Sequence, residues 1–126
     1  KAENNDPNAV WEAKDAGVTR HGNVVEVKMI AIRSHFTPDR IDANEGDEVV
    51  IHVTNVEQTA DMIHGLGIVE QNVNLVIDPG ETKTVRLTMK KTGVFPFYCT
   101  NFCSALHQEM QGYLAVKPAA AAVAAQ

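Results

Sequence analysis

The sequence has few of the features that mark several common classes of protein. Its 126 residues include only two cysteines, too few for a disulfide scaffold. No apolar run approaches the roughly 20 residues that a membrane-spanning helix needs, so no membrane segment is predicted. Basic residues are scarce as well, since 11 Lys and Arg accompany 16 Asp and Glu and give a formal net charge of −5. This acidic balance argues against a nucleic-acid partner, because such proteins usually carry a basic face.

The length and the apolar content fit one folded domain. A chain of 126 residues is enough for one domain of ordinary size and not for two. A hydrophobic fraction of 44% argues against global disorder. The first residue is Lys1 rather than Met, so we expect a processed or excised piece that lacks a signal peptide or an upstream domain.

Most of the chain has the apolar–polar alternation or the β-branched composition of short strands. Six segments have this character: residues 23–33, 48–55, 72–77, 82–89, 93–98 and 112–117. Turn residues separate them every 8–12 residues or so, which predicts an all-β fold, an antiparallel sandwich or Greek-key barrel. The polar stretch 56–67, with its glycines, is predicted to be a loop.

The two ends of the chain differ from this pattern. Asp6 and Pro7 precede good helix formers and predict a short N-terminal helix that ends at Gly17. The last residues, 119–126, are almost all alanine and specify no packing. We therefore divide the chain into a linker with a short helix (1–22), the main domain (23–117) and an Ala-rich tail (118–126).

The residues with the clearest chemistry lie between the fifth and sixth predicted strands. Cys99, Cys103, His107 and Met110 are spaced at offsets 0, +4, +8 and +11. Soft sulfur ligands with imidazole suit copper, and a weak Met ligand is typical of electron-transfer copper sites rather than structural zinc sites. The second cysteine allows two thiolates to bridge two metals, and His64 is the natural further ligand. On these residues alone, a disulfide, a structural Cys2His2 zinc site and a copper carrier remain as alternatives.

The pattern C-x3-C-x3-H-x2-M with an upstream histidine resembles the dinuclear copper A (CuA) site. That site occurs in cytochrome c oxidase subunit II and in the C-terminal cupredoxin domain of nitrous-oxide reductase. Segments 61–65 and 102–112 are more similar to the reductase family, and Asn101 stands where oxidases usually have Glu. The resemblance covers residues 23–117 and implies a cupredoxin-like Greek-key β-sandwich.

The resemblance also implies a ligand set for two copper ions in a mixed-valence centre. It implies that His64 and Met110 bind one ion, and that His107 and the backbone carbonyl of Asn101 bind the other. Cys99 and Cys103 bridge the two ions. In that family the domain accepts electrons from a small cytochrome c or cupredoxin. It passes them to a catalytic copper cluster that reduces N2O to N2. The cluster lies on a separate propeller domain in a head-to-tail homodimer, so the resemblance implies a periplasmic electron-accepting domain that lacks the catalytic cluster. A CuA domain of oxidase subunit II is the alternative.

Other polar residues receive simpler interpretations. His52 occupies an outward position in a predicted strand and is expected at the surface. Glu57, Asp61 and Glu109 are interpreted as solvated acids, one of which could accept the free N–H of a ligand histidine. Five apolar residues are candidates for a dry shell round the metals: Leu66, Phe95, Phe97, Phe102 and Leu106.

Overall fold

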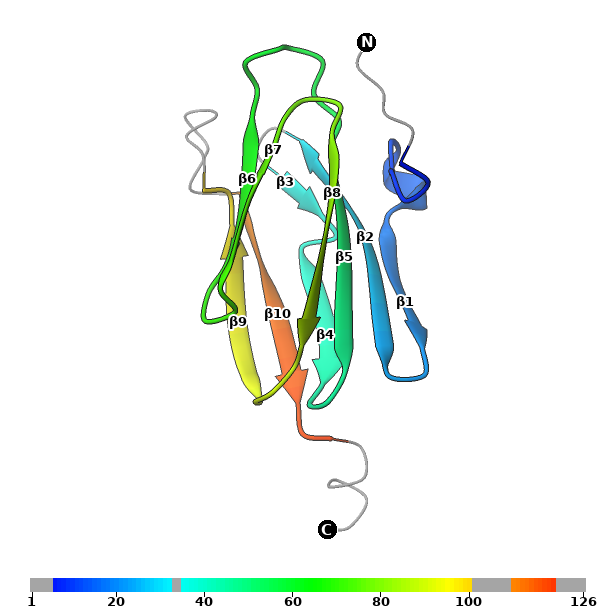
Figure 1. Ribbon diagram of the computed structural model, residues 1–126, viewed down its shortest axis with the longest axis vertical. Coiled ribbons are helices and arrows are strands. Elements are labelled where there is room, and N and C mark those ends of the chain that lie inside the picture. Colours follow the sequence, from blue (N-terminus) through cyan, green and yellow to red (C-terminus); the bar gives the residue numbers. More distant parts are fainter. Residues whose placement is uncertain (1–5, 33–34, 101–109, 120–126) are drawn as a thin grey trace.

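The computed structural model describes residues 6–32, 35–100 and 110–119, which form two β-sheets packed as a sandwich (Figure 1). The first sheet has the strand order β1-β2-β5-β8, and β3 pairs with β2. Its strands are β1 (Gly17–His21), β2 (Val24–Ile32), β3 (His35–Thr37), β5 (Glu48–Asn55) and β8 (Thr82–Thr88).

The second sheet has the strand order β4-β10-β9-β6-β7. Its strands are β4 (Arg40–Asn44), β6 (His64–Ile68), β7 (Val73–Ile77), β9 (Gly93–Tyr98) and β10 (Gln111–Lys117). The all-β sandwich predicted from the sequence is therefore confirmed.

Both sheets are mixed rather than purely antiparallel. β2 pairs with β5 in parallel, and β4 pairs with β10 in parallel, whereas the other neighbours are antiparallel. The parallel pair in the first sheet arises because the chain leaves that sheet to form β4 and returns as β5 in the direction of β2. A crossover of this kind is not visible in the local alternation that predicted the strands.

The core lies between the two sheets and follows the period-2 alternation of the strands. In β2, the side chains of Val25, Val27 and Met29 point inward and are at most 1% exposed. Phe36 of the first sheet meets Phe97 of the second edge to face, with ring centroids 5.6 Å apart. The core thus ties the first sheet to β9, the strand that leads into Cys99.

The predicted N-terminal helix is wrong. Asp6 Oδ1 accepts a hydrogen bond from the Asn8 backbone N–H at 2.8 Å, but only a single 3-10 turn, η1 (Ala13–Asp15), follows. Val10 is instead 2% exposed, and its N–H donates to Thr54 Oγ1 on β5 at 3.0 Å. A two-turn helix is marginal on its own, so the burial of Val10 against the sheet determines the conformation.

Three strands lie outside the six predicted segments, namely β1, β3 and β4, and the predicted loop 56–67 contains the start of a fourth, β6. Within the part of the chain that the structure describes, no helix has the length and apolar character needed to cross a membrane.

Candidate metal centre

The topology of the second sheet brings three strand ends together. β6 begins at His64, β9 ends one residue before Cys99, and β10 begins one residue after Met110. Because β9 is antiparallel to both β6 and β10, these three ends meet at the same end of the sandwich, the upper end in Figure 1. Three of the six predicted ligands are therefore neighbours in the fold although 46 positions separate the first from the last.

The side chains at this end are buried and close to one another. His64 is 0% exposed, and Cys99 and Met110 are each 1% exposed. Cys99 Sγ lies 3.9 Å from His64 Nδ1, and the Cys99 N–H donates to the carbonyl oxygen of Met110 at 3.0 Å. A thiol, an imidazole and a thioether thus share one water-excluded region, and these are the donor types that copper prefers.

Glu57 orients the imidazole of His64. Its Oε2 lies 3.0 Å from His64 Nε2, and the Glu57 side chain is only 14% exposed. An ionised carboxylate only accepts hydrogen bonds, so Nε2 carries the proton in the neutral ring. The lone pair of Nδ1 then faces the sulfur of Cys99. Metal-binding histidines are commonly held in this way, with the second nitrogen bound to a carboxylate.

The environment of His64 raises the pKa of its imidazole ring. Burial lowers the pKa of His64, but hydrogen bonds with Cys99 and with Glu57, together with their negative charge, outweigh it and raise the pKa above its ordinary value. The same negative environment favours a bound cation over an empty site, because a metal ion replaces the proton as the positive charge.

The loop that carries Glu57 is fixed by a buried amide. Asn55, which is 0% exposed, donates from Nδ2 to the carbonyl oxygens of Met62 and Ile77, each at 2.9 Å. Its Oδ1 accepts the Glu57 backbone N–H at 2.9 Å. The side chain of Asn55 therefore connects both ends of the β5–β6 loop to β7 and fixes the backbone at Glu57.

Glycine at position 67 leaves room for Thr100, the residue that follows Cys99. A Cβ atom at Gly67 would lie 2.7 Å from Thr100 Cγ2, closer than real contacts allow. The Thr100 hydroxyl is buried and has no hydrogen-bond partner among the described residues. A buried polar atom of this kind, next to a candidate ligand, is consistent with a site that gains further polar groups.

The structure leaves half of the predicted ligand set undetermined. Asn101, Cys103 and His107 lie outside the described residues, as does Glu109. Within residues 6–32, 35–100 and 110–119, no three His, Cys, Asp or Glu side chains are grouped to hold a metal ion. His64, Cys99 and Met110 nevertheless fit a copper centre by donor chemistry and burial, and copper binding stays a prediction.

Two further expectations have different outcomes. Leu66, Phe95 and Phe97, expected in the dry shell, are at most 3% exposed. His52, expected at the surface, is 3% exposed, and its ring nitrogens lie 2.7 Å from Thr84 Oγ1 and 3.0 Å from Glu26 Oε2. The alternation correctly put His52 on the outer face of β5, but cross-strand partners cover it there.

Comparison with known proteins agrees with this picture of the fold. The chain is 39% identical over 111 residues to a nitrous-oxide reductase of Cupriavidus necator; the match covers 88% of this chain but only 17% of the reductase. It is 32% identical over 123 residues to cytochrome c oxidase subunit 2 of Thermus thermophilus, a match that covers 93% of this chain and 88% of that subunit. Among solved structures, a heme-copper terminal oxidase dimer is similar, with a TM-score of 0.71 and 27% identity over 86% of this chain and 77% of that one. A family model for a cupredoxin-like domain matches residues 9–116. The chain therefore belongs to the cupredoxin-like domain family.

Proposed function

We propose that the chain is an electron-transfer domain with a dinuclear copper centre of the CuA type. It would accept electrons from a small redox protein and pass them to the catalytic copper cluster of a nitrous-oxide reductase. Six residues would hold the two ions: His64, Cys99, Asn101 through its carbonyl, Cys103, His107 and Met110. The observation that supports this most directly is the approach of His64 Nδ1 to Cys99 Sγ at 3.9 Å, in a buried region that also contains Met110.

The chain's own residues would serve electron transfer by resisting rearrangement. When bound, a thiolate-bridged pair of copper ions supplies a one-electron carrier whose charge is spread over two metals. Glu57 keeps the ring of His64 in one orientation, and the hydrogen bond from Cys99 to Met110 ties the two ends of the ligand segment. The apolar side chains of Leu66 and Phe97, both 0% exposed, keep water away from the sulfur. Little movement and little solvent response allow fast transfer at a small driving force.

A copper count combined with an EPR spectrum of the copper-loaded chain tests this proposal. We expect two coppers per chain and a signal in which one unpaired electron is shared by two copper nuclei. Cys99→Ser should abolish that pattern, whereas Met110→Leu should keep both metals and shift the reduction potential, because a thioether is a weak ligand. Zinc, a single copper or a disulfide in the loaded protein would contradict the proposal. Rapid loss of copper to a chelator would favour a copper carrier instead.

A second candidate is a CuA domain of an oxidase subunit II, because the chain is also 32% identical over 123 residues to the Thermus thermophilus subunit. The size of the native polypeptide distinguishes the two. A reductase predicts a native chain several times longer than 126 residues, with a further domain for the catalytic cluster, in a head-to-tail homodimer. A native chain close to this length would support the oxidase candidate.

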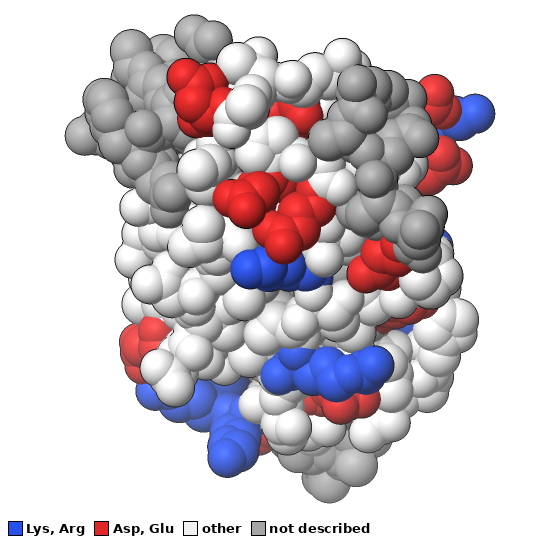
Figure 2. Space-filling view, turned by 45° about the horizontal axis from the view of Figure 1, so that its top comes forward, with Lys and Arg blue, Asp and Glu red and all other residues white. Residues whose placement is uncertain are grey.

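Partners and location follow from the same proposal. The donor would be a cytochrome c or a cupredoxin in the periplasm, where the parent enzyme would support denitrification. Acidic residues gather toward the upper part of the molecule in Figure 2, and basic residues toward the lower part. Glu57 and Asp78 belong to the end that carries the candidate centre, since Asp78 follows Ile77, the register partner of His64. An acidic surface there suits a donor with a basic face.

A further inference from the structure

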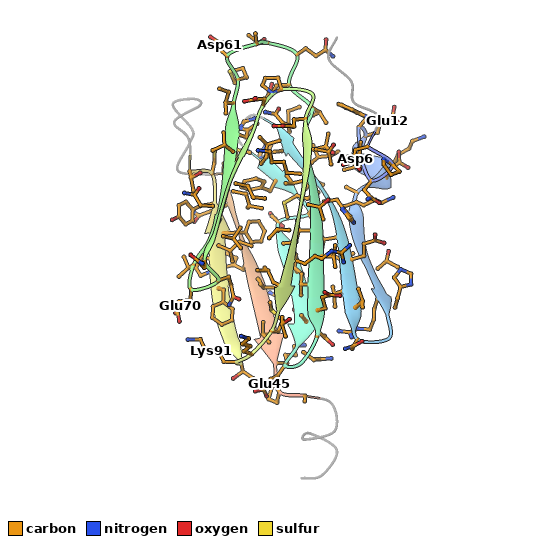
Figure 3. The ribbon with its side chains drawn as sticks, viewed as in Figure 1. Asp6, Glu12, Glu45, Asp61, Glu70 and Lys91 are labelled. Carbon is orange, nitrogen blue, oxygen red and sulfur yellow. The ribbon has the colours of Figure 1, made fainter. Side chains whose placement is uncertain are left out.

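The end of the sandwich far from the candidate metal centre contains a cleft that polar residues line for the most part. The cleft has a volume of about 560 Å³ and lies between the β6–β7 turn and the end of β8. Glu70, Gln71 and Asn72 line it from the turn, and Arg86 to Thr88 with Lys90 and Lys91 line it from β8 and the segment that follows. Figure 3 labels Glu70 and Lys91 toward the lower end of the molecule, away from Asp61 at the top.

The charges that line the cleft do not cancel. Lys91 Nζ forms an ion pair with Glu70 Oε1 at 2.6 Å, and this pair is neutral overall. Arg86 and Lys90 are exposed, and neither forms an ion pair among the described residues. Glu48 lies on the neighbouring strand, opposite Thr88, and it makes no ion pair with Arg86 there. The residues that line the cleft, with three basic side chains against one acid, therefore carry a net positive charge of two in a chain whose net charge is −5.

The remaining lining residues add donors to these charges. Asn72 and Gln71 carry amide groups and Thr88 carries a hydroxyl, while Leu87 supplies the half-buried apolar part of the wall. The backbone of the turn is constrained, with positive φ at Glu70 (64°) and Asn72 (56°). A guanidinium fork, an ammonium group and neutral donors in one cleft suit a tetrahedral oxyanion, which accepts several hydrogen bonds at once.

We propose that this cleft binds a doubly charged oxyanion of the phosphate class, held by the Arg86 guanidinium and the Lys90 ammonium. A net positive charge of two matches a dianion, and a phosphate monoester or inorganic phosphate carries about −1.5 to −2 charges at neutral pH. Glu70 does not oppose binding, because its charge is already matched by Lys91. The cleft contains no residue of the candidate metal centre. A negative result for phosphate binding would therefore leave the copper proposal unaffected, and the reverse also holds.

Titration of the full chain with inorganic phosphate, followed by backbone amide NMR at constant ionic strength, tests the site. We expect saturable shifts confined to residues 70–72 and 86–91. The variant Arg86→Gln/Lys90→Gln should lower the phosphate affinity at least about tenfold, since hydrogen bonds to charged groups are lost. The variant Lys28→Gln/Lys83→Gln removes the same two charges from the first sheet outside the cleft and should change the affinity less than about twofold.

A second experiment tests whether the bound phosphate group belongs to a lipid headgroup or to a soluble ligand. Vesicles of phosphatidylcholine with phosphatidic acid present a phosphomonoester, whereas pure phosphatidylcholine vesicles do not. Co-sedimentation with the first vesicles only, lost in Arg86→Gln/Lys90→Gln, would support the site with a lipid headgroup as ligand. Phosphate binding without vesicle binding would support it with a soluble ligand. The proposal would be overturned if the chain bound neither inorganic phosphate nor the phosphatidic acid vesicles. It would also be overturned if the two double variants lost phosphate affinity equally.

Discussion

A single carboxylate decides which nitrogen of His64 faces the sulfur of Cys99. Glu57 Oε2 lies 3.0 Å from His64 Nε2, and this leaves Nδ1 directed at Sγ. We expect Glu57→Leu to lower the copper affinity about 10- to 100-fold, the usual cost of losing a partner of a ligand histidine. Competition against a chelator measures this. Glu57→Gln is the matched control: its amide oxygen can still accept from Nε2, so most of the affinity should remain. Equal affinity in all three proteins would show that Glu57 does not orient the ring.

Glycine 67 has an equally local role, because it gives space to Thr100. We expect Gly67→Ala to displace Thr100, whose Cγ2 would lie 2.7 Å from the new Cβ, and to lower the free energy of unfolding by about 1–3 kcal/mol. The visible spectrum of the copper-loaded protein should change as well, since Thr100 follows Cys99 directly. Adding Thr100→Ala removes the clashing methyl group and should restore both properties. Failure of this second substitution to restore them would place the effect of Gly67 elsewhere.

At the scale of elements, the β5–β6 loop depends on Asn55. Asn55→Ala leaves the carbonyl oxygens of Met62 and Ile77 without their donor and the Glu57 N–H without its acceptor. We expect a loss of about 1–3 kcal/mol in the free energy of unfolding, together with faster loss of copper, because Glu57 loses its support. Chemical denaturation and chelator kinetics measure the two effects. A loss of stability with unchanged copper retention would separate the loop from the site.

The junction between β1 and the β4–β5 turn introduces a pH dependence. Asp47, 4% exposed, accepts hydrogen bonds from Arg20 Nη2 at 2.6 Å and from the Asn44 N–H at 2.7 Å. The hydrogen bond from Arg20 lowers the pKa of Asp47, and the Asn44 N–H and the Arg20 charge add to this against the opposing effect of burial. A lowered folded-state pKa gives stability that is complete above the unfolded value of about 4 and is lost as the pH falls through the folded value.

We therefore expect the free energy of unfolding to fall below about pH 4, and to fall less steeply in Asp47→Asn. At neutral pH the same substitution should cost about 1–3 kcal/mol. Asp42→Asn is a suitable comparison, since the Arg40–Asp42 pair is exposed, with side chains 65% and 51% accessible, and should matter much less. Urea titrations at several pH values measure both variants. A parallel pH profile for Asp47→Asn and the wild type would exclude this carboxylate as the source.

Strands with regular alternation could be predicted from the sequence, whereas elements defined by distant partners could not. β2 alternates between half-buried and buried positions over most of its length, and its sequence pattern shows it. β5 is buried at seven of its eight positions and could be predicted from its β-branched residues. β6 is buried at all five positions and contains two glycines, so it has neither alternation nor β-branched composition. The N-terminal segment has helical composition, but Val10 gains more by packing near Thr54 than a short helix gains in water.

Part of the candidate site could be predicted from the sequence for the same reason. Cys99 and Met110 lie on one segment with Cys103 and His107, and the spacing of all four predicted a metal centre. His64 lies on another strand, and its approach to Cys99 depends on the pairing of β6 with β9, which local pattern does not reveal. Glu57 could be named only as one of several acids, because its contact with His64 depends on the path of the loop that Asn55 fixes.

At the scale of the whole molecule, charge is distributed unevenly along the sandwich. Acidic side chains are more frequent toward the end with the candidate centre, whereas the cleft with Arg86, Lys90 and Lys91 lies toward the other end, together with Glu70 (Figures 2 and 3). A net charge of −5 alone would say only that a basic partner is attracted. The uneven distribution of charge also gives the molecule an electric dipole. This dipole orients the metal end toward a basic donor as the two proteins approach.

This polarity leads to a prediction about electron transfer from a basic cytochrome c. Asp61 and Glu45 are exposed acids that Figure 3 labels at opposite ends of the molecule. Asp61→Asn and Glu45→Gln change the net charge equally, but only the first weakens the field at the metal end. We expect Asp61→Asn to lower the bimolecular rate constant by about twofold at low ionic strength, with Glu45→Gln close to the wild type. The difference should vanish above roughly 0.5 M salt, where charges are screened beyond a few ångströms. Stopped-flow reduction of the copper-loaded chain measures these rates. Equal slowing by both substitutions would mean that the donor senses the total charge and has no preferred end.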